Sequence, residues 1–276
     1  MDKLKEILKK KLTNKELEIL PSSYDIVGSI LIFAGFPEEL KKKEKIIGEA
    51  LIGLHKNIKT VCKKTGQYSG KYRLPKLKII AGKKTKETTH KENNIVLKLD
   101  VEKAYFSPRS STERKRIFGQ IKKKESVLVM FSGSGPYPIS ISKNSEPKEL
   151  YSIEANPIAY KYQKENIEKN KIDNIKLFKG DVKKILPEIN KKFDRILMPL
   201  PKGAESYLDL AISKIKNKGT IHFYTFSKEG NYNEIKNIIK KECEKKKKKF
   251  KILNIVKCGT FSPRVYRICI DFKAYW

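Results

Sequence analysis

The spacing of apolar and polar residues differs between the two parts of the chain. Over residues 1–20, Leu and Ile alternate with Lys and Glu at helical spacing, which predicts a basic amphipathic helix. The run YDIVGSILIF at 24–33 predicts a strand, and 37–56 predicts a helix. Short apolar runs between 58 and 106 predict further strands joined by turns, and a helix is expected to begin near SSTERKRI at 110–117. These elements describe a small α+β domain.

From residue 125 onward, apolar runs alternate with stretches of helical length. The runs that predict strands are SVLVMFSG, ELYSIEAN, NIKLFKGD, FDRILMPLP and GTIHFYTF. Strand and helix in alternation imply right-handed crossovers and a parallel sheet covered on both faces. Two final runs, FKILNIVKCG and RVYRICIDFKAYW, have no helix between them and predict a hairpin. A five-stranded parallel sheet closed by a hairpin is typical of α/β class I, Rossmann-like methyltransferases. We therefore expect an N-terminal domain at 1–120 and a catalytic domain at 121–276.

The charge balance favours a polyanionic partner. Lys and Arg number 62 against 31 Asp and Glu, a formal net charge of +31, for which nucleic acid is the default partner. A Lys-rich genome or a hyperthermophilic habit is the alternative. No run approaches the length of a membrane span, and the N-terminus lacks the apolar core of a secretory signal. We therefore expect a cytoplasmic protein with no membrane partner.

The cysteines and histidines do not indicate a metal site. The four cysteines form no CxxC pair, and the three histidines lie far apart in the sequence. Neither a zinc site nor a disulfide framework is predicted, so we expect reduced and largely buried thiols.

Residues suited to a nucleotide-bearing cofactor follow three of the predicted strands. Gly133 and Gly135 come directly after the first strand, where glycines allow close backbone approach or simply an ordinary tight turn. Glu154 ends the second strand, where an acid can accept both ribose hydroxyls. Asp181 ends the third and could accept an adenine amino hydrogen or cap the next helix. Together these favour S-adenosylmethionine. A dinucleotide is rejected because the third glycine is absent and the chain ends in a hairpin.

Almost end to end, the sequence resembles the archaeal and eukaryotic tRNA (guanine-37-N1)-methyltransferases, a family that includes archaeal enzymes of the wyosine pathway. The segments that carry the resemblance are SYDIVGSILI, IGEALIGLHKNIKTVCKK, GKYRLPKLKIIAG, THKEN, DVEKAYFSPRSSTERKRI, MFSGSGPYP, EANPIAY, MPLPKGA, GTIHFYTF and FSPRVYRICIDF. The resemblance implies binding to the anticodon loop of a tRNA at position 37, and we expect a monomer without a metal. Many members carry a further N-terminal domain that helps to measure the tRNA, and this chain begins where the second domain would.

The resemblance implies roles for four residues of this chain. Arg73, in GKYRLPK, matches the arginine aimed at the target base, and Glu113, in STERKRI, matches the glutamate proposed as general base. Glu154 matches the ribose-binding acid, and Asp181 matches the adenine-side residue. From the residues alone, Arg73 could be a surface cation, and Ser110-x-x-Glu113 fits a capping box.

Further candidates complete the expected site. The cofactor set also includes Phe131, Val182, Tyr105 and Phe106. The last two, in AYFSPR, could stack on base or adenine or belong to the core. The substrate set is Arg73, Arg109, Arg114, Pro201 and Lys202.

Two positions depart from the family pattern. Val129 stands where an Asp usually precedes MFAG, and Pro199 stands where members have the Asn of an Asn-x-Pro motif.

Guanine N1 carries a proton, so its methylation needs a base such as Glu113 and a cation such as Arg73 for the developing oxyanion. The target purine must also leave its stack in the anticodon loop to enter the pocket.

Pro199 bears on which base is methylated. A proline has no N–H and presents an apolar wall, which suits a tricyclic base whose nucleophile is a ring carbon. Relatives methylate carbon 7 of 4-demethylwyosine, so both guanosine N1 and this carbon stay open as targets, and Pro199 is counted among the catalytic candidates. The alternatives are transfer of the aminocarboxypropyl group on the same fold, or a non-catalytic RNA-binding module.

Overall fold

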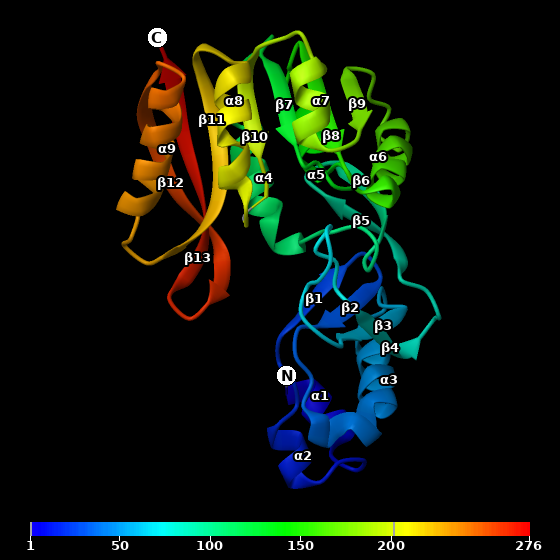
Figure 1. Cartoon of the computed structure of the whole chain (residues 1–276). Coiled ribbons are helices and arrows are strands. Elements are labelled where there is room, and N and C mark those ends of the chain that lie inside the picture. Colours follow the sequence, from blue (N-terminus) through cyan, green and yellow to red (C-terminus); the bar gives the residue numbers. More distant parts are fainter. Residues whose placement is uncertain (1, 201) are drawn as a thin grey trace. The chain divides into compact units, whose positions relative to one another are not determined.

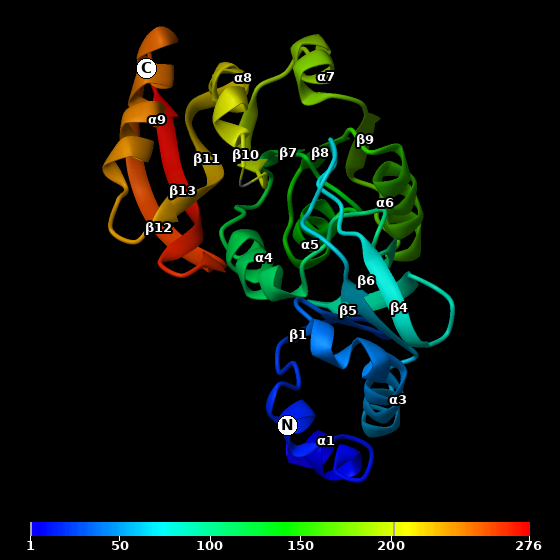
Figure 2. The ribbon, with the colours of Figure 1, turned by 60° about the horizontal axis from the view of Figure 1, so that its bottom comes forward.

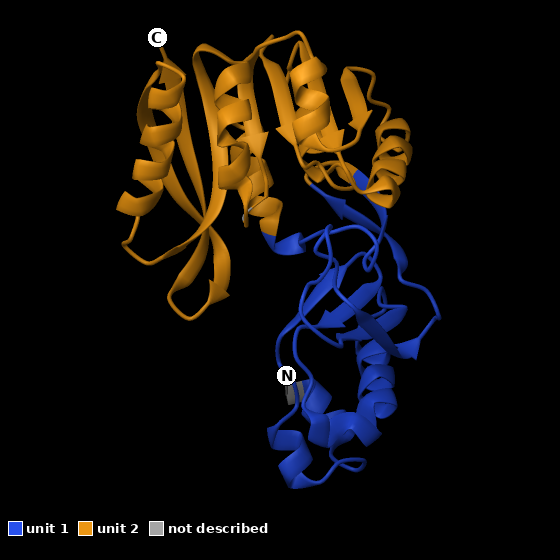
Figure 3. Cartoon of the chain, viewed as in Figure 1, with its two compact units in different colours: residues 1–92, 96–109 blue, residues 93–95, 110–276 orange. Residues whose placement is uncertain are grey.

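The structure, a computed structural model, describes residues 2–200 and 202–276, which divide into two compact units. Unit 1 comprises the residues up to Glu92 together with Val96–Arg109, and unit 2 comprises Asn93–Ile95 together with Ser110–Trp276 (Figure 3). The expected domain boundary lies near residue 120, whereas helix α4 (Ser111–Phe118) is grouped with unit 2. The reason is packing: Ile117 of α4 is buried in a core cluster with Val127 and Leu197.

Unit 1 is an α+β unit built on a four-stranded sheet of order β1-β2-β3-β4 (Figure 1). Its strands are β1 (Tyr24–Val27), β2 (Ile30–Phe33), β3 (Thr60–Lys64) and β4 (Leu77–Gly82). Its helices are α1 (Asp2–Leu8), α2 (Asn14–Glu18), the 3-10 helix η1 (Glu38–Lys43) and α3 (Glu44–Leu54). The 3-10 turn η2 (Pro108–Ser110) ends at the first residue of the second segment of unit 2. Strands β5 (Glu87–Glu92) and β6 (Ile95–Asp100) form a separate two-stranded sheet.

Local turn chemistry divides two segments of unit 1 that the sequence pattern treats as continuous. The expected helix over 1–20 is two helices, because Thr13 caps α2 in a reciprocal capping box with Glu16. The expected strand over 24–33 is the antiparallel pair β1 and β2. They are joined at Gly28, whose φ of +56° permits the tight turn.

Unit 2 is built on a seven-stranded sheet of order β12-β13-β11-β10-β7-β8-β9. Its strands are β7 (Ser126–Met130), β8 (Glu149–Glu154), β9 (Ile175–Lys179), β10 (Phe193–Met198), β11 (Ile215–Lys228), β12 (Lys249–Ser262) and β13 (Val265–Tyr275). Strands β7 to β11 pair in parallel, and β13 pairs antiparallel with both β11 and β12. The predicted parallel sheet with a C-terminal hairpin is confirmed.

Helices cover both faces of this sheet. The 3-10 helix η3 (Ala204–Tyr207) and helices α7 (Val182–Glu188), α8 (Leu208–Lys214) and α9 (Asn233–Lys245) contribute to the larger core cluster on one face. Helices α4, α5 (Pro136–Asn144) and α6 (Pro157–Lys169) lie on the other face, and Figure 2 shows α4 and α5 opposite α7 and α8. None of the helices in the described ranges is long and apolar enough to span a bilayer.

The strand order places one sheet edge where ligands bind in such folds. Strand β7 lies between β8 and β10, so the chain reverses its direction of winding at β7. In open parallel sheets, ligands bind at the carboxyl ends of the strands beside such a switch point. The residues that follow β7, β8, β9 and β10 therefore meet at the edge where the candidate cofactor residues were expected.

Candidate active site

The turn after β7 has a left-handed backbone at three nearby positions. Phe131, Gly133 and Gly135 have φ values of +59°, +61° and +93°. A Cβ on Gly135 would lie 2.7 Å from Cδ1 of Ile139 and 2.9 Å from Cγ of Gln163, so only glycine fits there. Gly135 is also the N-cap of α5, and Pro136 follows it as the first residue of the helix. The predicted glycine turn is thus a tightly packed one.

Helix α6 braces this turn through two buried amide side chains. Ser132 donates its hydroxyl to Oε1 of Gln163 at 2.7 Å, and Nε2 of Gln163 donates to the Ser152 hydroxyl at 2.6 Å. Asn166 donates Nδ2 to the carbonyl of Ser134 at 3.0 Å. The sequence analysis did not identify Gln163 and Asn166. Polar residues on the inward face of a helix were the available signal.

Glu154 ends β8 with its carboxylate held by backbone donors. The N–H of Gly133 donates to Oε2 at 2.6 Å, and the N–H of Asn156 donates to Oε1 at 2.7 Å. Burial raises the pKa of Glu154, and these backbone hydrogen bonds partly offset that effect. Each oxygen keeps a lone pair for a further donor, so the fixed carboxylate can accept from ribose hydroxyls. This acceptor fits the ribose hydroxyls of S-adenosylmethionine.

Asp181 and its neighbours form the next part of the edge. Asp181 caps α7 by accepting from the N–H of Lys183 at 2.9 Å, so the capping interpretation is confirmed, and Val182 is buried. The ring of Phe131 packs edge-on against Tyr207 at 4.8 Å between centroids. Burial raises the pKa of Tyr207, and the charge of Asp181 adds to this. Tyr207, which the sequence analysis missed, therefore belongs to the same edge as Asp181 and Phe131.

Pro199 follows β10 directly and is half-buried. The N–H of Leu200 donates to the carbonyl of Met198 at 2.8 Å, which turns the chain sharply after the strand. Lys202 is exposed, and Pro201 lies outside the described residues. Pro199 thus lies at the switch-point edge of the sheet, at the position where members of the resembled family have an Asn.

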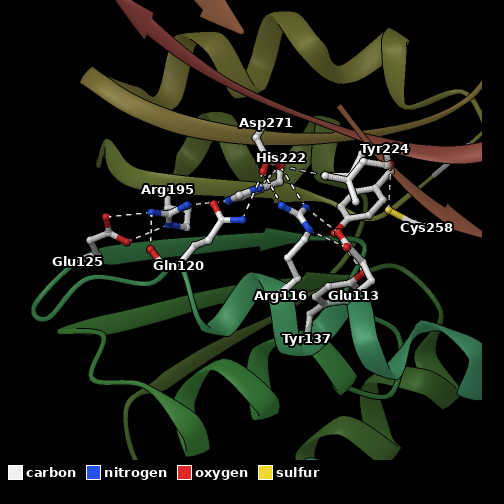
Figure 4. Close-up of polar contacts among 12 residues, drawn as sticks. Glu113, Arg116, Gln120, Glu125, Tyr137, Arg195, His222, Tyr224, Cys258 and Asp271 are labelled. Carbon is white, nitrogen blue, oxygen red and sulfur yellow. Dashed lines mark hydrogen bonds and ion pairs between the residues drawn. The ribbon is translucent and has the colours of Figure 1, made fainter. Parts of the chain in front are cut away.

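Glu113 is 5% exposed and its carboxylate has three donors from two side chains (Figure 4). The hydroxyl of Tyr224 donates to Oε1 at 2.6 Å. Arg116 donates Nε to Oε2 at 2.7 Å and Nη2 to Oε1 at 2.8 Å. The capping box at Ser110 is not formed, since its side chain makes no capping bond and instead accepts from Nη2 of Arg267. Glu113 is therefore held by tertiary contacts.

A buried polar network continues from Arg116 into the sheet. Arg116 donates Nη1 to Asp271 at 2.5 Å, and Nδ1 of His222 lies 2.6 Å from the same carboxylate. Arg195 donates Nη1 to Nε2 of His222 at 2.7 Å and Nε to Glu125 at 2.8 Å. Because an arginine only donates, Nε2 of His222 must accept, which leaves its Nδ1–H to donate to Asp271. The network in Figure 4 thus joins α4 to three strands.

The charges in this network follow from the same contacts. Burial lowers the pKa of His222, consistent with a neutral ring that accepts from Arg195. Burial alone would raise the pKa of Asp271, but its bonds to His222 and Arg116 hold the pKa well below the ordinary value. Cys269 lies beside them, and ligand atoms of Cys269, His222 and Asp271 lie within 4.8 Å of one another. Their lone pairs and protons already serve these hydrogen bonds, and two guanidiniums adjoin them, so the arrangement fits a polar network better than a cation site.

Arg114, a candidate for substrate binding, is 2% exposed. Its guanidinium lies 6.0 Å from the centroid of the Tyr137 ring. The Tyr137 hydroxyl donates in turn to Tyr224 at 3.2 Å. Arg114 is thus packed in the interior of unit 2, with little surface open to an RNA.

The remaining candidates belong to unit 1. Arg73 has a φ of +52°, and its N–H donates to the carbonyl of Gly70. Tyr105 is 42% exposed and packs against Tyr68, and Phe106 packs against His90 at 5.0 Å between centroids. Arg109 donates Nε to Asp25 at 2.5 Å. Tyr105 and Phe106 line a small cleft of unit 1 together with Asp25, Val27, Ile32, Lys64, Tyr68, Pro75, Leu77, Val101 and Pro108.

Two protein-family models together match most of the chain. Residues 4–85 match the TYW2 N-terminal domain, and residues 88–253 match the TRM5/TYW2 methyltransferase domain. The tRNA (guanine(37)-N(1))-methyltransferase Trm5b of Pyrococcus abyssi is 43% identical over 255 residues, which are 92% of this chain and 75% of that protein. Its crystal structure is similar with a TM-score of 0.87 and 41% identity, covering 96% of this chain and 79% of that one.

Two further relatives bear on substrate and partner. The tRNA (guanine(37)-N(1))/4-demethylwyosine(37)-methyltransferase Taw22 of Nanoarchaeum equitans is 34% identical over 301 residues, covering 90% of this chain and 98% of that protein. The complex structure of aTrm5 and tRNALeu is similar with a TM-score of 0.84 and 33% identity, covering 98% of this chain and 77% of that one.

Proposed function

Because the chain belongs to the TRM5/TYW2 methyltransferase family, we propose that it methylates the purine at position 37 of a tRNA with S-adenosylmethionine. The target is N1 of guanosine, carbon 7 of 4-demethylwyosine, or both, since names of its relatives include both reactions. The relative solved with tRNALeu and the net charge of +31 support tRNA as the partner. The proposed location is the cytoplasm, where the tRNA substrate would be present.

The observation that carries this proposal is the bond between the glycine turn and Glu154. The N–H of Gly133 donates to Oε2 of Glu154 at 2.6 Å, so the turn after β7 and the acid that ends β8 are joined by a hydrogen bond. In the proposed roles, Glu154 accepts from the ribose hydroxyls, while Asp181 and Val182 lie on the adenine side. The rings of Phe131 and Tyr207, which pack edge-on against each other, are the proposed apolar wall of that side.

The cofactor supplies a methyl group on a sulfonium, which is already activated for transfer, so the protein must orient the target and manage its proton. Glu113 is the proposed general base for guanine N1. The donors from Tyr224 and Arg116 hold its carboxylate in place. Oε1 accepts two of these hydrogen bonds and Oε2 accepts one, so a lone pair of Oε2 remains to accept the proton. Arg73 is the proposed cation for the charge that develops on the guanine oxygen, a role that rests on the family resemblance.

Pro199 is the proposed determinant of substrate choice. Its ring offers neither a side-chain acceptor nor an N–H at the end of β10, where the family pattern has an Asn. A tricyclic base presents a larger apolar ring to this position, and an apolar contact stabilises it more than a hydrogen bond to an amide would. Pro199 is therefore proposed to favour 4-demethylwyosine over plain guanosine. Methylation of carbon 7 then replaces a ring C–H hydrogen, and that proton also needs a base such as Glu113.

The test offers the full-length chain two tRNAs, one with guanosine and one with 4-demethylwyosine at position 37. Nucleosides are then analysed by mass spectrometry after incubation with S-adenosylmethionine. We expect a gain of one CH₂ unit on the tricycle, and Pro199→Asn should shift the preference towards guanosine. An unchanged preference in that variant would remove Pro199 from the proposal. A product that carries the heavier aminocarboxypropyl group would mean that the chain transfers this group and not a methyl group.

A further inference from the structure

We propose that Phe226 and Phe261 form a platform on which an unpaired tRNA base next to the target purine stacks. This inference rests on the proposed function, because it names the nucleotide that this part of unit 2 binds. The two rings lie 4.4 Å apart between centroids with an angle of 38° between their planes. Phe261 is 65% exposed, the highest value among the exposed large apolar side chains of the described residues. The exposed ring of Phe261 beside that of Phe226 offers an aromatic face on which a base can stack.

The strand register places this pair beside the candidate base. On β11, Phe226 follows Tyr224 by two residues, so both side chains point to the same face of the sheet. Two residues of strand span about 7 Å. Tyr224 holds Glu113, so the platform begins two residues along β11 from the residue that holds this carboxylate, towards the carboxyl end of the strand. This two-residue separation along β11 is comparable with the distance between neighbouring bases in an unstacked RNA strand.

A cation without a counter-ion adjoins the rings. Arg267 pairs directly across the strands with Phe226. Its Nη2 donates to the Ser110 hydroxyl at 2.7 Å and to the carbonyl of Cys258 at 2.8 Å, while its Nε is buried without a partner. No carboxylate in the described ranges forms an ion pair with it. The charge of Arg267 therefore has no carboxylate to neutralise it, which favours a phosphate of the bound strand nearby.

The tip of the hairpin adds charge of the same sign. Phe261 begins FSPR, the second copy of a four-residue motif that also occurs at 106–109, and Arg264 ends it. Arg264 has a φ of +59° in the turn between β12 and β13 and is exposed, as is Lys228 at the end of β11. Exposed rings flanked by cations bind single-stranded nucleic acid through stacking and phosphate contacts. With the net charge of +31, this chemistry favours an RNA loop over a protein partner.

The test measures binding of a fluorescent anticodon stem-loop RNA to the full chain without cofactor, so the result does not depend on methyl transfer. We expect Phe261→Ala to weaken binding about tenfold, as removal of a base-stacking ring does elsewhere. Phe261→Trp should restore affinity. The matched control is Leu253→Ala, which changes an exposed apolar side chain on the same strand and should leave binding unchanged.

A second RNA separates stacking from a general loss of affinity. It is the same stem-loop with abasic sites on both sides of position 37, and on it Phe261→Ala should bind as the unmodified chain does. The platform is wrong if Phe261→Ala binds the intact loop normally, or if it loses equal affinity for both RNAs. A chain that binds the loop through Phe261 but transfers no methyl group would contradict the proposed function and leave the platform standing.

Discussion

Tyr224 donates its hydroxyl to Oε1 of Glu113 at 2.6 Å, across 111 residues of sequence, and so joins strand β11 to helix α4. Arg116 donates to both oxygens of the same carboxylate and also binds Asp271. A base that must meet a ring nitrogen at one angle benefits from such restraint, because its orientation is set before the substrate arrives. We propose that this restraint prepares Glu113 for catalysis.

Tyr224→Phe removes one donor from Glu113 and leaves the ring in the core. We expect kcat for tRNA methylation to fall about tenfold, as loss of a hydrogen bond to a charged group would produce, with KM for tRNA little changed. Tyr137→Phe is the matched control, because the Tyr137 hydroxyl donates to Tyr224 and not to Glu113. Steady-state kinetics check both variants, and equal losses in the two would speak against a direct role for Tyr224.

Glu154→Gln tests the cofactor site. An amide has one acceptor oxygen, so it cannot accept from Gly133, Asn156 and two ribose hydroxyls together. Affinity for S-adenosylmethionine, measured by calorimetry, should fall roughly tenfold or more. Glu149→Gln, at the other end of β8, removes ion pairs with Lys176 and Lys191 and should leave that affinity unchanged. Normal cofactor binding by Glu154→Gln would place the ribose elsewhere.

Gly135→Ala tests the packing of the turn. The added Cβ would meet Ile139 and Gln163 at under 3 Å in a left-handed backbone, so unit 2 should lose about 1–3 kcal/mol of unfolding free energy. Gly53→Ala, in helix α3 with nothing within 4 Å of its Cβ, should stabilise unit 1 by up to about 1 kcal/mol. Urea unfolding measures both. A neutral Gly135→Ala would show that the turn relaxes easily.

His222 gives unit 2 a pH dependence of defined sign. Burial lowers its pKa in the folded chain, so the unfolded chain binds the proton first as pH falls. The free energy of unfolding should therefore decrease as pH falls through the ordinary histidine value of about 6.5. Asp271, whose folded pKa is lowered, adds a further loss only at more acid pH.

The variant His222→Gln removes that titration while keeping a polar side chain beside Asp271. Between about pH 7 and 5, its melting temperature should fall less steeply than that of the unmodified chain. Thermal unfolding at several pH values provides the comparison. Parallel slopes would mean that His222 does not titrate between the two states.

Sequence periodicity was sufficient to predict the sheet of unit 2, because a parallel strand that is buried on both faces has a continuous apolar run in its sequence. It was insufficient where a single turn divides a pattern, as Thr13 and Gly28 do in unit 1. The glycine turn and Glu154 were also predictable, since residues after consecutive parallel strands meet at one edge.

The network behind Glu113 could not be predicted in the same way. His222 and Asp271 are single polar residues inside apolar strands, and nothing in their spacing indicates that they bind one another across 49 positions. Gln163 and Asn166 likewise acquire their roles only when α6 packs against the turn. Such contacts depend on tertiary packing, which local patterns do not encode. The catalytic and binding roles of the candidates remain predictions.

Transfer of a labelled methyl group tests the central claim most directly. The chain is incubated with tRNA and S-adenosylmethionine carrying the label on its methyl carbon, and the labelled nucleoside is located by digestion and mass spectrometry. We predict label at position 37, with incorporation largely lost in Glu113→Gln although that variant still binds the cofactor. Label at another position, or full incorporation by Glu113→Gln, would contradict it.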